Sequence, residues 1–211
     1  MNKGFFDQDW DSEEDKKEEP KKKSSTSSAK RTLFAVIDFI KTTIIVVFLA
    51  LIIRLFVVQP FIVEGQSMLP TFSNNDYLIT EKISYSIRSP KRGEIVIFHP
   101  PDNPTVNYIK RIVGLPGDSI EVRDQNVFVN SQKINEPYLT SNEQTNTATK
   151  DLNLTLKSGE YFVLGDNRNH SRDSREIGPI PYSSIVGRIW VRLLPIDSAR
   201  AFAAINYEGI N

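Results

Sequence analysis

The 211-residue sequence contains no cysteine, only two histidines and no net charge, since 26 lysine and arginine residues balance 26 aspartate and glutamate residues. Without cysteine the chain can form neither disulfides nor thiolate metal sites, and it has no cysteine nucleophile. The two histidines, His99 and His170, are too sparse for a convincing metal centre. The even charge balance provides no whole-chain attraction to nucleic acid. We therefore expect no metal, no cofactor and no nucleic-acid partner.

Residues 1–32 are charged and serine-rich. A mostly acidic run at 11–19 is followed by three lysines at 21–23 and by serines up to residue 28. Such a segment cannot bury enough apolar surface to offset the entropy lost on folding. We predict that residues 1–32 form a disordered tail, whose role the sequence leaves open.

Residues 33–63 form the one long apolar segment, in which Asp38, Lys41 and Arg54 are the only charged residues. The uncharged stretch 42–53 would span only about 18 Å as a helix, against about 30 Å of hydrocarbon in a bilayer. Because the long side chains of Lys41 and Arg54 can snorkel to the interface, a helix over residues 33–58 is long enough to cross. Pro60 lacks a backbone donor and disfavours helix at the preceding residue, which sets the expected end.

The apolar segment has two alternative explanations. A cleavable signal sequence would begin nearer the N-terminus and end in small residues, which residues 59–63 do not provide. A buried core helix would seldom be apolar on every side. The sequence therefore favours a membrane anchor. Six basic residues lie between positions 21 and 41, whereas the next one after Arg54 is Lys82. The positive-inside rule then predicts a cytoplasmic N-terminus and an extracellular segment 59–211.

The remainder of the chain has the pattern of a β-domain. Residues 94–98 are a short apolar run between Arg92-Gly93 and Pro100-Pro101, as is typical of a strand buried on both faces. Further strands are predicted over 106–113, 119–122, 126–129, 160–164 and 185–194. The polar residues 140–151 predict a mobile loop, and residues 199–211 a short helix. The expected fold is mainly β: a single N-terminal transmembrane helix followed by an extracytoplasmic antiparallel β-domain.

Ser67 and Lys110 are the candidate catalytic residues. A lone serine is usually an ordinary loop residue, but a serine with a lysine is a known nucleophile and base pair that needs neither histidine nor cysteine. The two-residue period of a strand places Lys110 on the same face as Tyr108 and Ile112. A buried lysine is driven toward its neutral form, which is what a general base requires. A solvent-facing strand lysine is the alternative, and this pattern alone does not exclude it, because Arg111 also has apolar neighbours.

Four blocks of the sequence resemble, in this order, the motifs of bacterial type I signal peptidases. They are EGQSMLPT (64–71), RGEIVIF (92–98), YIKRIVGLPGD (108–118) and GDNRNHSRDSR (165–175). With the preceding apolar segment the resemblance covers residues 34–195, and four ordered blocks are far more specific than a lone Ser-x-x-Pro. The resemblance implies a membrane-anchored serine endopeptidase that removes N-terminal signal peptides from exported preproteins at the outer face of the cytoplasmic membrane. Ser67 would be its nucleophile and Lys110 its general base.

The same resemblance implies further roles. Ser171 corresponds to a serine that hydrogen-bonds and orients the lysine, and Asp173 with Arg175 to an ion pair that holds the loop, although a solvated charged loop is the usual explanation of such a run. His170 has no implied role. Gly65 stands where members from bacteria with two membranes carry a serine that acts as the second oxyanion donor. The Ser67 N–H can still donate, and the second donor is left open. Residues 119–160 would form a short accessory insertion.

The implied partners are signal peptides with small side chains one and three residues before the cut, the lipid bilayer and, as a candidate, the secretion translocon. Shallow apolar pockets around residues 61–63 and Ile109 would recognise the small side chains. Ser67 lies seven positions after Pro60, at most roughly 23 Å of chain, so the nucleophile should lie near lipid.

Two other functions compete with this interpretation. One is a catalytically idle membrane-tethered β-domain that acts as a binding or assembly module, which would be expected to have lost Lys110. The other is a self-cleaving serine-lysine repressor, which would carry a DNA-binding helical domain in place of the hydrophobic segment.

Overall fold

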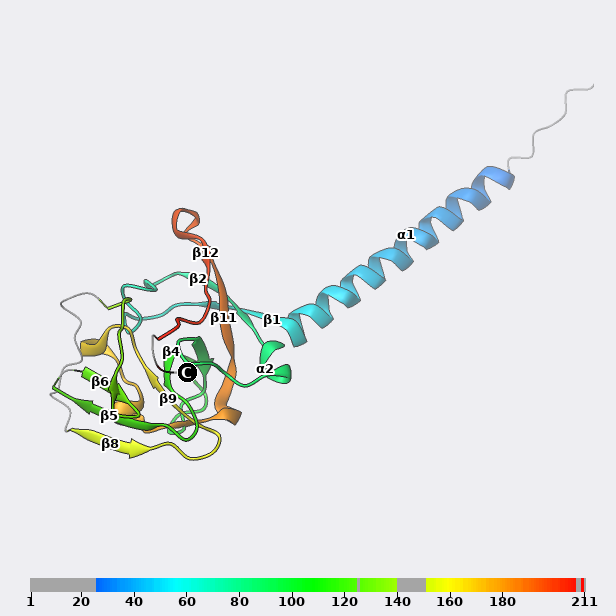
Figure 1. The fold of residues 1–211 in the computed structure, drawn as a ribbon. Coiled ribbons are helices and arrows are strands. Elements are labelled where there is room, and N and C mark those ends of the chain that lie inside the picture. The colour runs from blue at the N-terminus through cyan, green and yellow to red at the C-terminus, as the bar shows by residue number, and fades with distance from the viewer. Residues whose placement is uncertain (1–25, 125, 140–150, 208–209, 211) are drawn as a thin grey trace, which may run out of the picture. The chain divides into compact units, whose positions relative to one another are not determined.

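The computed structural model describes residues 26–124, 126–139, 151–207 and 210 (Figure 1). The chain divides into two compact units, residues 1–47 and 48–211. The main helix, α1 (Thr26–Ile52), has 27 residues. Its part from Lys30 to Ile52 is long and apolar enough to cross a membrane, judged by length and composition.

Helix α1 begins at Thr26, so the expectation of a disordered tail up to residue 32 is wrong for its last residues. Residues 27–32 contain alanine, lysine and arginine and neither glycine nor proline, so a helix nucleated in the apolar segment continues through them. Their polarity limits burial, not helix formation. Residues 1–25 lie outside the described residues.

The C-terminal end of the predicted helix also differs. α1 ends at Ile52, a π-helical turn covers Ile53–Val57, and strand β1 (Val58–Ile62) follows. Pro60 therefore lies within a strand that pairs with β2 (Tyr77–Glu81) at the edge of a sheet. An edge strand tolerates proline, because part of its backbone needs no partner.

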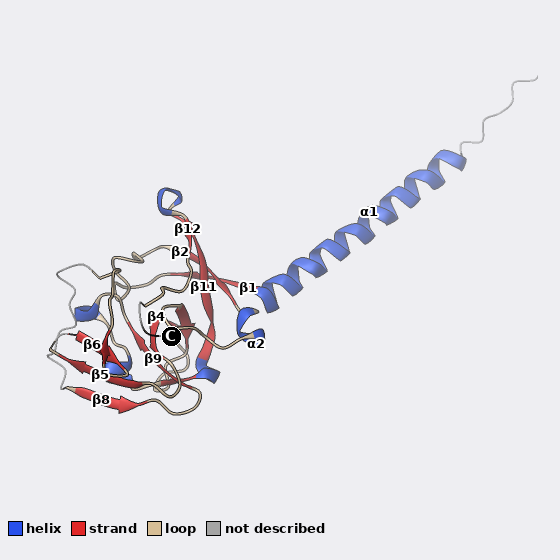
Figure 2. Cartoon of the chain, viewed as in Figure 1, coloured by secondary structure: helices blue, strands red, loops and turns tan. Residues whose placement is uncertain are grey.

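From residue 58 onward the second unit contains two antiparallel sheets, and in its described residues short helices appear only as connections (Figure 2). The larger sheet has the order β1-β2-β11-β3-β4-β9-β10, with β12 paired to β11. Its further strands are β3 (Ile95–Phe98), β4 (Tyr108–Gly114), β9 (Glu160–Leu164), β10 (Ile180–Pro181), β11 (Ile185–Leu194) and β12 (Arg200–Ala201). The smaller sheet, in the order β7-β6-β5-β8, consists of β5 (Ser119–Arg123), β6 (Asn126–Val129), β7 (Gln132–Lys133) and β8 (Leu152–Thr155). The connections include α2 (Ser84–Ile87) and α3 (Ser174–Ile177).

The mainly β prediction is confirmed, and each predicted strand is present with a shift of at most two residues at its ends. Strand β3 is buried along its whole length, as its apolar run predicted. Two hydrophobic clusters pack on the larger sheet, and a third joins β4 and β9 to the smaller sheet. The predicted mobile loop 140–151 lies outside the described residues except for Asp151.

The predicted helix at 199–211 is wrong. The described residues of this segment form the short strand β12 and then an irregular path, with Tyr207 and Ile210 buried. This path runs backbone against backbone: Gly93 has a φ of +83°, and a Cβ atom there would lie 2.4 Å from the Ile205 carbonyl oxygen. Phe202 also packs on Phe72, with ring centroids 4.7 Å apart. Tertiary packing therefore overrides the local preference of this segment.

Candidate active site

Ser67 lies in the connection between β1 and β2, where its backbone is held from two sides. The buried Met68 and Phe72 anchor the residues that follow it in the core. On the other side Asn167 donates its backbone N–H to the Ser67 carbonyl at 3.0 Å and its side-chain amide to the Gln66 carbonyl at 3.1 Å. These contacts fix the backbone from which the Ser67 hydroxyl projects.

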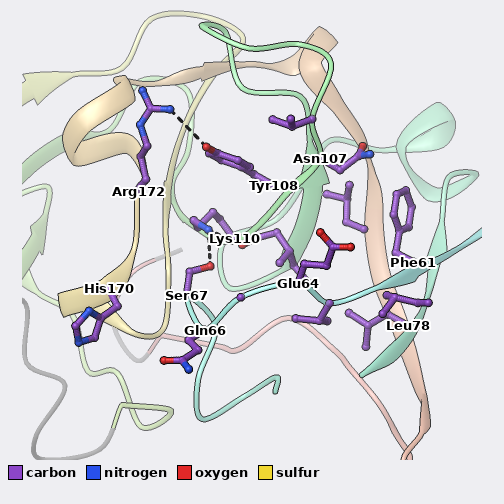
Figure 3. Close-up of a pocket in the computed structure, with 16 residues that line it drawn as sticks. Phe61, Glu64, Gln66, Ser67, Leu78, Asn107, Tyr108, Lys110, His170 and Arg172 are labelled. Atoms are coloured by element: carbon purple, nitrogen blue, oxygen red, sulfur yellow. Dashed lines mark hydrogen bonds between the residues drawn. The ribbon is translucent and has the colours of Figure 1, made fainter. Parts of the chain in front are cut away.

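Lys110 lies on β4 and reaches Ser67 across 43 residues of sequence. Its Nζ atom donates to Ser67 Oγ at 2.7 Å and to the carbonyl of Ile109 at 3.0 Å (Figure 3). The lysine is only 4% exposed. The alternative of a solvent-facing strand lysine is therefore wrong, because both faces of β4 are covered at this point.

Burial lowers the pKa of Lys110 from 10.5 to about 8. The negative charges of Asp173 and Asp166 act in the opposite direction and raise it, whereas the positive charge of Arg175 lowers it further. Desolvation is the largest cause, since an ammonium group loses its hydration in a covered strand. The arrangement therefore gives a hydroxyl in contact with an amine that deprotonates near neutral pH.

The loop 165–175 carries two buried ion pairs beside this dyad. Arg175 Nε lies 2.8 Å from Asp173 Oδ1, and the other oxygen of Asp173 accepts from the Gly165 N–H at 3.0 Å. Arg111, which follows Lys110, binds Asp166 through Nε at 2.9 Å and Nη2 at 2.6 Å. All four side chains are nearly inaccessible to solvent. The alternative of a solvated charged loop is therefore wrong for these pairs.

A third ion pair connects this loop to the segment between β7 and β8 of the smaller sheet. Arg168 binds Glu136 with both terminal nitrogens, and its Nε donates to the Gly165 carbonyl at 3.0 Å. Arg175 closes the arrangement by donating to the Arg168 carbonyl at 2.7 Å. The backbone of the loop is thus braced at Gly165, one residue before Asp166.

The implied hydrogen bond between Ser171 and Lys110 is absent from this structure. The Ser171 hydroxyl is buried and has no hydrogen-bond partner. It lies instead against Gly165, where a Cβ atom would come within 2.1 Å of Ser171 Oγ and 2.6 Å of the Ser67 carbonyl oxygen. Ser171 is brought beside the dyad, but as a small side chain packed under the Ser67 backbone.

A cleft of about 650 Å³ opens over the dyad (Figure 3). One part has an apolar lining from Phe61, Val63, Leu78, Ile97 and Ile109. Gln66, His170 and Arg172 line its other, polar part, and Ser67 and Lys110 lie between them. The segments 61–63 and Ile109, which were expected to form apolar pockets, do line this cleft. Within the described residues, no three His, Cys, Asp or Glu side chains gather as a metal site.

Several residues of this site were missed by the sequence reasoning. Asn167 holds the Ser67 backbone, Arg111 pairs with Asp166, and the ring centroid of Tyr108 lies 5.3 Å from Lys110 Nζ. All four residues lie within the sequence blocks 108–118 and 165–175, and this position was the one indication that they belong to the site. A buried pair separated by 55 residues leaves no local pattern, so the partners could not be assigned from spacing.

Comparisons with known proteins agree on one family. The profile described as "Signal peptidase, peptidase S26" matches residues 36–194. "Signal peptidase I P" of Bacillus subtilis subsp. natto is 39% identical over 179 residues, which cover 81% of this chain and 96% of that protein. "Signal peptidase I" of Bacillus licheniformis is 38% identical, with 77% and 91% covered. A solved structure of signal peptidase I from Enterococcus faecalis is 34% identical over 48% of this chain and 97% of its own, with a TM-score of 0.41.

Proposed function

The chain belongs to the peptidase S26 family of signal peptidases, serine peptidases that remove signal peptides from preproteins, and on this premise we propose that Ser67 is its nucleophile and Lys110 its general base. The observation that carries the proposal is the 2.7 Å contact between Lys110 Nζ and Ser67 Oγ inside a cleft. The lowered pKa of Lys110 supports it, because a base must be neutral to accept the serine proton.

The chemistry follows from these two groups. As Ser67 Oγ attacks the scissile carbonyl carbon, its proton passes to the neutral Lys110 amine, and a tetrahedral intermediate forms. The ammonium then donates this proton to the leaving nitrogen, the C–N bond breaks, and the signal peptide stays bound to Ser67 as an ester. Lys110 next takes a proton from the water that attacks the ester, and returns this proton to Ser67 Oγ as the acyl C–O bond breaks. Ser67 and neutral Lys110 are restored, and the peptide leaves as an acid that ionises to its carboxylate.

The Ser67 N–H is the proposed donor to the oxyanion of the intermediate, since it lies on the residue that attacks. Gly65 does not offer its own N–H, because that group donates to Asn74 Oδ1 at 2.9 Å. Asp173 and Arg175 are proposed to hold the loop beside the base, and Ser171 to keep it close-packed under the Ser67 backbone. A bystander role for His170 also stays a proposal.

The apolar part of the cleft supports a substrate with small, uncharged side chains one and three residues before the cut. We propose the bilayer as a second partner, since the helix from Lys30 to Ile52 suits a membrane anchor, and the secretion translocon as a further candidate. The basic residues ahead of the anchor support a single-pass protein with a cytoplasmic N-terminus. Residues 59–211 would then be the extracytoplasmic catalytic domain, with 119–160 as its accessory insertion.

The deciding experiment is incubation of the full-length protein in detergent with a purified preprotein, followed by sequencing of the new N-terminus. We expect one cut directly after the signal peptide and no cut by Ser67→Ala. An intact preprotein would favour the idle binding module, and equal cleavage by Ser67→Ala would exclude Ser67 as the nucleophile.

The absence of cysteine permits a direct test of orientation. Single-cysteine variants Ser12→Cys and Ser158→Cys can be treated in intact cells with a maleimide that does not cross membranes. We expect labelling at position 158 and not at 12, and the opposite pattern would reverse the proposed topology.

A further inference from the structure

Glu64 is a carboxylate inside the cleft that the proposed chemistry does not use. It stands three residues before Ser67, lines the same cleft and is exposed. Its side chain rises into the cleft between Lys110 and Phe61 (Figure 3). Within the described part of the chain no hydrogen bond or ion pair engages this carboxylate.

The other charged side chains of the cleft already have partners. Arg172 binds Asp102 and also lies 3.3 Å from Glu176. Lys110 is bound to Ser67 and is the group that must become neutral. Among the described residues that line the cleft, Glu64 is the single acidic one, so it presents an uncompensated negative charge to whatever the cleft binds.

The alternation of β1 and the residues after it shows which way Glu64 points. Val63 is 5% exposed and packs in the core with Phe61, whereas Ile62 is 59% exposed and Glu64 is exposed as well. Phe61 and Val63 therefore face the floor of the cleft, and Glu64 faces its open side. Side chains of an extended peptide alternate in the same way. If positions −1 and −3 before the cut enter the floor, position −2 points toward the side on which Glu64 lies.

We propose that Glu64 is a specificity-determining residue that favours lysine or arginine at position −2 of the substrate and disfavours aspartate or glutamate there. The inference rests on the proposed function, which supplies the direction and register of the peptide. Because ion pairs at exposed sites are weak, the expected effect is about two- to fivefold in kcat/KM. It should shrink at high salt, where the Debye length falls to about 3 Å at 1 M.

The test uses three fluorogenic signal-sequence peptides that are identical except for Lys, Gln or Glu at position −2. Initial rates are measured with the full chain in uncharged detergent for wild type, Glu64→Gln and Glu64→Lys. Asp197→Asn serves as the matched control, because Asp197 is exposed but does not line the cleft. For wild type and for the control we expect kcat/KM to be highest for the Lys peptide, lower for Gln and lowest for Glu. The three values should be equal for Glu64→Gln, and their order should be reversed for Glu64→Lys.

Two results would overturn the inference while leaving the proposed function intact. One is a Glu64→Gln variant whose kcat/KM values for the three peptides keep the order found for wild type. The other is an equal rise in KM for all three peptides in that variant, which would mean that Glu64 binds substrate backbone. Failure of wild type to cut the Gln peptide, or cutting that survives Ser67→Ala, would instead overturn the proposed function and this inference with it.

Discussion

Replacing Lys110 by arginine separates a lysine that acts as a base from one that acts as a cation. Arginine keeps the positive charge and much of the length, but its pKa above about 12 prevents it from becoming neutral. If Lys110 removes the Ser67 proton, Lys110→Arg should therefore be as inactive as Lys110→Ala. If the lysine only stabilised the oxyanion by its charge, arginine should retain part of the activity.

The size of the effect follows from the pKa of about 8 that burial gives to Lys110. At pH 7 about one lysine in ten is then neutral, compared with about three in ten thousand at the ordinary pKa of 10.5. Burial thus increases the neutral fraction about 300-fold, which corresponds to about 3 kcal/mol. The rate of wild type should accordingly rise about tenfold per pH unit below pH 8 and become level above it.

The assay measures kcat/KM for a fluorogenic signal-sequence peptide from pH 6 to 10 in detergent. The peptide should carry no group that titrates in this range, so that the profile reports the enzyme. Ser67→Ala supplies the background, and melting temperatures show whether Lys110→Arg is folded. Substantial cleavage by the folded arginine variant at any pH would refute the reasoning. A wild-type rate that falls as the pH rises from neutrality would refute it as well.

Three further predictions concern the surroundings of the dyad. Lys110→Met should be more stable to urea than wild type at pH 7, by on the order of 2 to 3 kcal/mol, because protonated Lys110 destabilises the fold below its lowered pKa. This gain in the free energy of unfolding should vanish toward pH 10.5. An equal gain at both pH values would contradict the prediction. Arg175→Gln removes a cation that lowers the pKa of Lys110, so the midpoint of the rate profile should move to higher pH, and an unmoved midpoint would exclude this influence. Ser171→Ala removes a buried hydroxyl without a hydrogen-bond partner, so the melting temperature should not fall. Ser171→Val should lower the melting temperature, because its larger side chain crowds Gly165. A destabilised alanine variant would indicate a hydrogen bond that this structure lacks.

The strands of the core could be predicted because each contains a local run or alternation of apolar residues. Residues 94–98 are apolar in every position but the first, and β3 is buried throughout. Strand β1 was missed because its apolar residues continue those of α1 without a break. Pro60 marked the end of the helix, but nothing local marked the residues around it as a strand. The C-terminal segment was wrongly predicted as a helix for a related reason. Its path depends on the backbone of Gly93 and the ring of Phe72, which are distant in sequence.

The candidate site was predictable to the extent that chemistry limited the choice of residues. With no cysteine and two histidines, a serine and a lysine in fitting sequence blocks were the natural pair, and they lie in contact. Their supports were not predictable, because a hydrogen bond from Asn167 to the Ser67 backbone requires knowledge of which loops meet. The hydrogen bond from Ser171 to Lys110 is the opposite case, because the resemblance implied it and the structure does not contain it. A role carried over from a motif does not determine the rotamer or the partner of a side chain.

The electrostatic balance at Lys110 supports a role for the buried arginines in the proposed chemistry as well as in the fold. Asp166 and Asp173 both favour protonated Lys110, and an unpaired carboxylate in this covered region would oppose the effect of burial. The loop nevertheless needs both carboxylates, since Asp173 accepts from the Gly165 N–H and Asp166 from the Thr71 hydroxyl. Arg175 and Arg111 pair with them and neutralise their charge. The loop can therefore keep the hydrogen bonds that position Ser67 while Lys110 remains able to lose its proton near neutral pH.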